Sequence, residues 1–250
     1  MGLYTSDRPD VPGMRGLHLF HFVMSNCSQR VRIALEEKDL PWTSHHLNLA
    51  ANEHVTEDYQ WLNPNGVVPT LVHDGQVVIE SNDILAYLED HFPEPAPRPA
   101  SVDGRGEMEA RIAESSAFQS TIKVLSHELL FRPFRQMGAD EIALYQEKHN
   151  DPALVSWIRD YAEAGPAWRE RVERAQQALK STLDALEAAL AACDWLSGQA
   201  YGLADISWVV NFHRLNQAQV DLSPWPRFAA WGKRATDRPA FGRAVIHYTP

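Results

Sequence analysis

A hydroxyl and a thiol, which together could support thiolate chemistry, lie close together near the start of a helix. Ser25 and Cys27 follow the apolar residues 17–23, and from Cys27 onward apolar residues recur at helical spacing. A helix N-terminus stabilises a thiolate, and a nearby hydroxyl can donate a hydrogen bond to it. The stabilised thiol is either that of Cys27 or that of a bound ligand. Because Cys27 shares its apolar stripe with Val31 and Leu35, a buried and inert thiol is the alternative.

A second group of residues predicts a site for an anion. Glu80 and Ser81 stand where a strand ends and a helix begins, so free backbone N–H groups and a hydroxyl converge there. Pro69 interrupts an apolar strand. It indicates either an edge strand or a cis Val68–Pro69 bond that turns the Val68 backbone outward to pair with an extended peptide. Together these features predict a site for a peptide-sized anion.

The elements that position these residues follow from the hydrophobic period and the turn signals. The order is β-α-β-α-β-β-α, with Asp74-Gly75 as the turn of a hairpin and Ser81 as the cap of the last helix. The expected strands cover residues 17–23, 42–49, 68–73 and 76–80, and the expected helices cover residues 26–38, 56–62 and those from 81 onward.

Proline spacing divides the chain into two domains. Pro93, Pro95, Pro97 and Pro99 alternate with other residues, which excludes helix and sheet and predicts a stiff linker. Beyond them, the spacing of apolar residues predicts only helices, at residues 107–131, 166–192, 203–216, 226–235 and 239–246. The predicted organisation is a flexible extension at 1–16, an α/β domain at 17–92, a proline-rich linker at 93–104 and an all-α domain at 105–250.

Composition excludes several classes of function. The formal net charge of -10 opposes binding to nucleic acid or to an anionic membrane surface. No apolar run is long enough to span a bilayer, the N-terminus does not resemble a secretory signal, and two cysteines cannot form a disulfide scaffold. We therefore expect a cytoplasmic protein. His45, His46 and His54 suggest a metal site, but a fourth ligand is missing, so no metal is expected.

Three motifs now resemble those of a known family. Residues 25–35 are similar to the S-x-C-x-x-R-V-R-I-A-L run of zeta-class glutathione transferases, and N-P-x-G-x-V-P-T-L follows at residues 63–71. Residues 198–206 resemble that family's helix-capping motif, although Gly202 stands where Ser or Thr is usual. The chain is identified as a zeta-like member of the cytosolic glutathione S-transferase superfamily. Its pattern is most similar to tetrachlorohydroquinone reductive dehalogenase and to the ganglioside-induced differentiation-associated proteins, partly through an insertion at residues 136–168.

The resemblance implies a thioredoxin-like α/β N-terminal domain, an all-α C-terminal domain and glutathione as co-substrate. The Val68 backbone, before a cis Pro69, would pair with the cysteinyl unit of glutathione, and Glu80 and Ser81 would hold its γ-glutamyl end. His54 would reach the glycine carboxylate. The plain alternatives are that Ser81 is only a helix cap and that His54 is a solvated loop residue.

The resemblance also implies the catalytic groups. Ser25 matches the serine that donates to the glutathione sulfur in zeta enzymes, and Cys27 matches the nucleophile of the dehalogenase. A small hydrophobic electrophile would bind over the sulfur, between the two domains. Five residues are candidates for its pocket, with a core role as the alternative for each aromatic one: Phe22, Asn26, His127, Phe131 and Trp208.

These features predict a glutathione S-transferase-type enzyme that directs a thiolate at a hydrophobic or aromatic electrophile. Reductive dehalogenation or ether cleavage through Cys27 would be special cases, and glutathione-dependent cis–trans isomerisation is an alternative. A non-catalytic glutathione-binding protein of the same fold is the rival from another class. The family also implies a homodimer.

Overall fold

The computed structural model describes residues 2–95, 102–134, 137–148 and 151–250. The chain forms two compact units. The first comprises Met1–Ala96, Lys148–Asn150 and Asp237–Pro250, and the second comprises Pro97–Glu147 and Asp151–Thr236. Half of the predicted linker, residues 96–101, lies outside the described residues, and a helix already begins at Val102.

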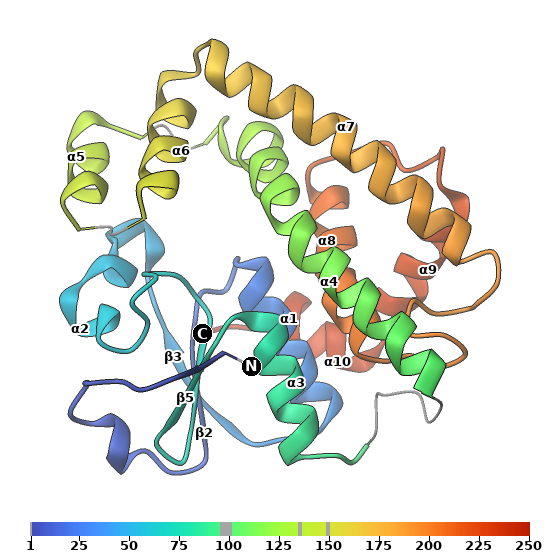
Figure 1. The fold of residues 1–250 in the computed structure, drawn as a ribbon, viewed down its shortest axis with the longest axis horizontal. Coiled ribbons are helices and arrows are strands. Elements are labelled where there is room, and N and C mark those ends of the chain that lie inside the picture. The colour runs from blue at the N-terminus through green and yellow to red at the C-terminus, as the bar shows by residue number, and fades with distance from the viewer. Residues whose placement is uncertain (1, 96–101, 135–136, 149–150) are drawn as a thin grey trace. The chain divides into compact units, whose positions relative to one another are not determined.

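The first unit contains a five-stranded mixed sheet in the order β1-β5-β4-β2-β3. Three of these strands, β2, β3 and β5, are labelled in Figure 1. Among the strands that the structure describes, only β2 and β3 pair in parallel. Its strands are β1 (Leu3–Tyr4), β2 (Leu17–His21), β3 (Trp42–His46), β4 (Thr70–His73) and β5 (Gln76–Ile79), and its first helices are α1 (Asn26–Glu37), α2 (Glu57–Gln60) and α3 (Ser81–His91). The predicted β-α-β-α-β-β-α order and the thioredoxin-like arrangement are confirmed.

The two faces of this sheet are covered by different helices. Phe20 on β2 packs with Tyr59 of α2 and with Val72 and Val77 in one buried cluster. Side chains alternate along a strand, so the neighbouring Leu19, which is fully buried, points to the opposite face. That face carries α1 and α3, which pack against each other (Figure 1).

The N-terminal residues are not the flexible extension that the sequence predicted. Leu3 and Tyr4 form β1 and pair with Val78 and Val77 of β5. Val11 is 2% exposed and joins the buried cluster of the α2 face. The prediction of a loose segment was wrong because a strand pairing and the burial of Val11, both with residues far away in sequence, hold it to the sheet.

The C-terminal residues 237–250 also depart from the predicted boundary, because they belong to the first unit. They contain α10 (Pro239–Phe241) and a π-helical turn, Gly242–Ile246, and both pack on α1. Arg238 binds Glu37 of α1 through two hydrogen bonds of 2.7 Å. This segment therefore acts as part of the α/β unit.

The second unit is all-helical in its described residues, as predicted. Its core forms where α4 packs on α7 and α8, around fully buried leucines such as Leu183 and Leu186. Its helices are α4 (Val102–Leu125), which continues as a π-helical turn (Ser126–Phe131), α5 (Ala139–Lys148), α6 (Pro152–Glu163), α7 (Pro166–Ala189), α8 (Leu203–Gln217) and α9 (Pro226–Thr236). Two of them, α5 and α6, occupy the predicted insertion.

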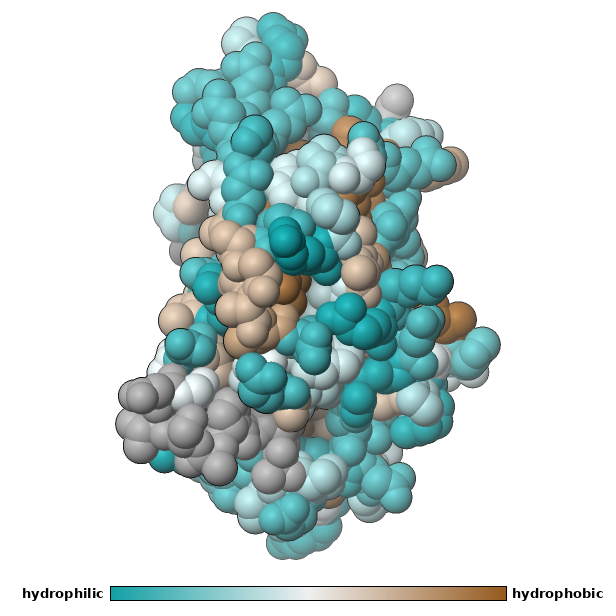
Figure 2. Space-filling view, turned by 90° about the vertical axis from the view of Figure 1, so that its right-hand side faces the viewer, coloured by the Kyte–Doolittle hydropathy of each residue, from teal (hydrophilic) through white to brown (hydrophobic). Residues whose placement is uncertain are grey.

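The surface is largely polar on the face shown in Figure 2. The face in Figure 2 is mostly hydrophilic, and apolar residues gather only in small areas of it. Among the described residues, no helix has both the length and the apolar character that crossing a membrane requires.

Candidate functional site

The serine before α1 has the geometry of a hydrogen-bond donor at a helix start. Ser25 is the N-cap, with extended backbone angles (φ -72°, ψ 122°), and its Oγ accepts the backbone N–H of Ser28 at 3.3 Å. Because Oγ accepts this bond, the hydroxyl proton remains available to donate to an anion. The chemistry expected of Ser25 is therefore compatible with its role as a cap.

Cys27 lies in the first turn of α1 as a free and only partly buried thiol. Val31 and Leu35, which share its apolar stripe, are fully buried. The stripe therefore becomes accessible at its N-terminal end, where the cysteine stands. The inert alternative requires a thiol that is fully buried in the core, and Cys27 is not fully buried.

The Val68–Pro69 peptide is cis, as predicted. Pro69 leads into β4, a central strand of the sheet, so the edge-strand explanation of this proline is wrong. The preceding carbonyl, that of Val67, accepts hydrogen bonds from Tyr59 and Asn63. In the described part of the chain we find no hydrogen bond to the Val68 backbone, whose N–H and C=O can therefore pair with a ligand.

The start of α3 differs from the predicted cap. Glu80 is the N-cap, with a left-handed backbone (φ 66°), and Ser81 is the first helical residue. Ser81 is 7% exposed, and its Oγ accepts a hydrogen bond of 2.7 Å from a guanidinium nitrogen of Arg30. The reading of Ser81 as an ordinary helix cap is therefore wrong. Its hydroxyl can donate to a carboxylate, because the oxygen already has a donor.

Arg30 is a site residue that the sequence prediction missed. It is 2% exposed and reaches from α1 to Ser81 at the start of α3. Burial lowers the pKa of Arg30, while its electrostatic interaction with Cys27 acts in the opposite direction and raises it. One signal was present in the sequence, since Arg30 follows Cys27 by three residues and so falls on the buried side of the helix.

His54 lies in a short 3-10 turn, Glu53–Val55, between β3 and α2. Its side chain is 7% exposed, so the alternative of a solvated loop residue is wrong. The turn is held by Glu53, whose carboxylate accepts the backbone N–H of Asn48 at 2.7 Å. A role for His54 in binding a carboxylate stays a prediction.

The predicted pocket residues are divided between the units. In the first unit, Phe22 is half-buried and Asn26 is 7% exposed at the start of α1. In the second unit, His127 and Phe131 share the π-helical turn, with their rings edge to face at 5.3 Å. Trp208 is fully buried and donates its indole N–H to a backbone carbonyl of α4, so it takes the core role that was its alternative.

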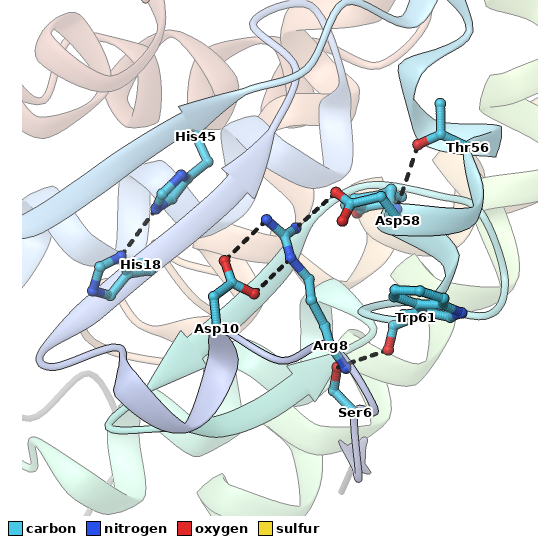
Figure 3. Close-up of polar contacts among 9 residues, drawn as sticks. Ser6, Arg8, Asp10, His18, His45, Thr56, Asp58 and Trp61 are labelled. Carbon is cyan, nitrogen blue, oxygen red and sulfur yellow. Dashed lines mark hydrogen bonds and ion pairs between the residues drawn. The ribbon is translucent and has the colours of Figure 1, made fainter.

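A hollow of about 330 Å³ opens on the first unit, but none of the residues predicted to hold glutathione lines it. Arg8 lies at its edge, where its guanidinium binds Asp10 at 2.8 Å and faces Asp58 at 3.6 Å (Figure 3). His45 also lines the hollow and is hydrogen-bonded to His18 at 2.9 Å. The charge of Arg8 is already neutralised by two carboxylates, so this hollow does not resemble the predicted anion site.

Two of the three histidines that suggested a metal site make other contacts. His45 bonds His18, and His46 accepts the backbone N–H of Val23 at 3.3 Å, so one ring nitrogen of each is occupied. Among the described residues, no group of three or more His, Cys, Asp or Glu side chains is arranged to hold a metal ion.

Comparison with known proteins connects this geometry to a family. The family model described as "Glutathione S-transferase, N-terminal domain" matches residues 19–96, and "Glutathione S-transferase, C-terminal domain" matches residues 166–234. The maleylpyruvate isomerase of Ralstonia sp is 30% identical over 234 residues, which cover 92% of this chain and 96% of that protein.

Two further relatives have different named activities. The tetrachloro-p-hydroquinone reductive dehalogenase of Sphingobium chlorophenolicum is 26% identical over 260 residues, covering 93% of this chain and 97% of that protein. The crystal structure of the beta-etherase LigF from Sphingobium sp. strain SYK-6 superimposes with a TM-score of 0.83 at 26% identity, covering 91% and 98% of the two chains. Since both domains match in order and a relative with 30% identity spans almost the whole chain, the protein is a zeta-like member of the glutathione S-transferase superfamily.

Proposed function

We propose that the protein binds glutathione along its first unit and activates the glutathione thiol for attack on an apolar or aromatic electrophile. The observation that carries this proposal is the hydrogen bond of 2.7 Å between Arg30 and Ser81. It connects the helix that begins after Ser25 with the helix that begins at Ser81. The buried contact between Arg30 and Ser81 thus connects the two helix starts that carry the proposed donors: Ser25 for a thiolate and Ser81 for a carboxylate.

Each part of glutathione has a matching group in this proposal. The free backbone of Val68 pairs with the cysteinyl unit, as one extended strand pairs with another. The Ser81 hydroxyl and the N-terminus of α3 bind the γ-glutamyl carboxylate, and Glu80 accepts from its ammonium group. His54 binds the glycine carboxylate at the other end.

In the simpler of two chemical routes, Ser25 is the only catalytic group on the protein. The glutathione thiol loses its proton to water, and the Ser25 hydroxyl donates a hydrogen bond to the thiolate. The sulfur then attacks the electrophilic carbon, a carbon–sulfur bond forms, and the leaving group departs with its electron pair. The accessible hydroxyl at the N-cap supports this route.

In the second route, Cys27 acts after a glutathione thioether has formed. The Cys27 thiolate attacks the glutathione sulfur, and the carbon–sulfur bond breaks while the carbon takes up a proton. A second glutathione thiolate then attacks the mixed disulfide, which releases glutathione disulfide and restores the cysteine. The partly exposed position of Cys27 supports this route.

The relatives have different named activities, which supports the proposal that members of this family share a thiolate and differ in the electrophile that it attacks. An isomerase, a dehalogenase and an etherase all show 26–30% identity to this chain. A panel with glutathione separates the reactions: a halogenated hydroquinone, a β-aryl ether and a maleyl keto acid, with products identified by mass spectrometry.

We expect turnover of at least one member of this panel. Binding of glutathione without turnover of any of them would favour the non-catalytic alternative. Cys27→Ser distinguishes the two routes in an active enzyme. If conjugation and dehalogenation both survive in Cys27→Ser but collapse in Ser25→Ala, the cysteine route is wrong.

Replacing Arg30 by lysine is expected to weaken glutathione binding about tenfold, because a charge-assisted hydrogen bond that orients Ser81 is lost. Lysine keeps the positive charge but not the planar donor geometry of the guanidinium. Isothermal titration of the full chain with glutathione measures the change in Kd.

The matched control is a double-mutant cycle with Ser81→Ala. If Arg30 acts through Ser81, the double variant loses no more affinity than Ser81→Ala alone. Additive losses would show that Arg30 acts independently of the Ser81 hydroxyl, and the proposed orientation of that hydroxyl would be wrong.

A further inference from the structure

A second arginine of α1, Arg32, is fully buried and surrounded by backbone carbonyls. Its guanidinium donates to the carbonyl of Val23 at 3.0 Å, to that of Phe22 at 3.4 Å and to that of Ala244 at 2.9 Å. Within the described residues, no carboxylate lies at ion-pair distance from it. A buried charge of this kind is expensive unless its hydrogen bonds are satisfied, so these three carbonyls must keep their positions.

Two of these carbonyls belong to the turn that carries Ser25. The backbone N–H of Ser25 donates to the Phe22 carbonyl at 3.1 Å, so Arg32 shares its acceptor with the bond that closes the turn. The Val23 carbonyl also accepts from Gln29 at 3.3 Å. Two side chains of α1, Arg32 and Gln29, therefore hold the turn before the N-cap through its backbone carbonyls.

Arg32 also fixes the tautomer of His21. A guanidinium can only donate, so the contact of 3.2 Å makes His21 Nδ1 an acceptor and leaves the proton on Nε2. That nitrogen can then donate to the Ser44 hydroxyl at 2.9 Å. Burial and, secondly, the charge of Arg32 lower the pKa of His21 to about 3, in agreement with a neutral ring.

The C-terminal segment completes this cluster through Tyr248. The guanidinium carbon of Arg32 lies 4.4 Å from the centre of the Tyr248 ring, which is stacked on Trp42 at 5.9 Å. The Tyr248 hydroxyl lies 3.0 Å from that of Ser44 and 3.2 Å from His21 Nε2. The residues 244–248 thus enclose the side of Arg32 that does not face the turn.

We propose that Arg32, enclosed by Ala244 and Tyr248, is a positioning residue that sets the place of the Ser25 hydroxyl. The C-terminal segment keeps the guanidinium in one orientation, and the guanidinium keeps the carbonyls of Phe22 and Val23 in the geometry that the N-cap needs. This inference rests on the proposed function of Ser25, but its structural half can be measured without any ligand.

The structural half is tested by hydrogen exchange of the peptide that covers residues 22–26 in the free protein. Tyr248→Ala is expected to accelerate exchange of this peptide about tenfold, because the turn loses its fixed acceptor geometry. The control is Arg238→Ala, which removes the ion pair with Glu37 from the same segment but leaves the groups that Arg32 contacts in place. It is expected to leave exchange of residues 22–26 unchanged.

The functional half is tested by the pH profile of kcat/KM with glutathione and an active electrophile. In Tyr248→Ala and in Arg32→Lys, the midpoint of the profile is expected to rise by about one pH unit, since a misplaced hydroxyl stabilises the thiolate less well. Arg238→Ala should keep the profile of the unchanged protein. Should Tyr248→Ala not fold, Tyr248→Leu keeps an apolar side chain against Trp42.

The outcomes separate the two proposals. If the unchanged protein does not bind glutathione, the proposed function fails while the exchange experiment still stands. Equal exchange in Tyr248→Ala and in the unchanged protein would overturn the role of the C-terminal segment. An equal acceleration in Arg238→Ala would show that loosening the segment anywhere has this effect, and would overturn the specific role of the contact between Tyr248 and Arg32. An unmoved pH midpoint in both Arg32→Lys and Tyr248→Ala would overturn the positioning of Ser25.

Discussion

Replacing Ser25 by alanine is expected to lower kcat/KM for glutathione conjugation by about 10- to 100-fold, the cost of losing one hydrogen bond to a charged group. The same change removes the N-cap of α1, whose Oγ accepts the N–H of Ser28, and should cost about 1 kcal/mol of stability. Steady-state kinetics and thermal unfolding measure the two effects separately.

Two further variants separate the hydroxyl from the cap. Ser25→Thr keeps both the donor and the cap acceptor and should retain most of the activity. Ser25→Asp keeps a good cap acceptor but has no hydroxyl and adds a negative charge beside the thiolate, so it should be stable and inactive. Full conjugation activity in Ser25→Ala would mean that another group stabilises the thiolate, with Cys27 as the first candidate.

Replacing Asp205 by alanine is expected to destabilise the second unit by about 4 kcal/mol, because buried donors lose their acceptor. This carboxylate is fully buried at the start of α8. It accepts the N–H groups of Leu196, Ser197 and Gly202 at 2.8–3.1 Å and the indole N–H of Trp231 at 2.7 Å. Burial is the main reason that the pKa of Asp205 is raised. Denaturant unfolding followed by tryptophan fluorescence measures the loss.

Asp205→Asn is a stricter version of the same test. Asparagine has one oxygen and one NH₂ group, so two of the four donors would face another donor. We expect a large part of the alanine effect to remain. The matched control is Asp221→Asn, since Asp221 is exposed and accepts one backbone N–H, from Ser223. A loss in Asp205→Asn no larger than in that control would contradict the account of this cluster.

Local signals explain which parts could be predicted from sequence. Asp74-Gly75 turns the hairpin, and Ser25 caps α1, because turns and caps depend on residues a few positions apart. Pro69 could be interpreted because its strand is otherwise apolar, and the cis peptide before it is confirmed. Glu80 was not expected as the cap of α3, since its left-handed backbone is unusual for glutamate.

Contacts between distant residues explain what was missed. Ser81 is 51 positions from Arg30, and Ala244 is 212 positions from Arg32, so no local pattern could connect them. The burial of Val11 depends in the same way on Phe20 and Tyr59 across the α2 face. Buried arginines are also rare, and the usual expectation for such a residue is a solvated surface. The catalytic candidates could therefore be proposed from the sequence, whereas the buried contacts of Arg30 and Arg32 could not.

Calorimetric titration of the full chain with glutathione tests the central claim most directly. We predict saturable heat that S-methylglutathione abolishes by competition, and weaker binding in Ser81→Ala, whose lost hydroxyl is oriented by Arg30. No heat with glutathione, together with no competition by the analogue, would contradict the proposal that the first unit binds glutathione.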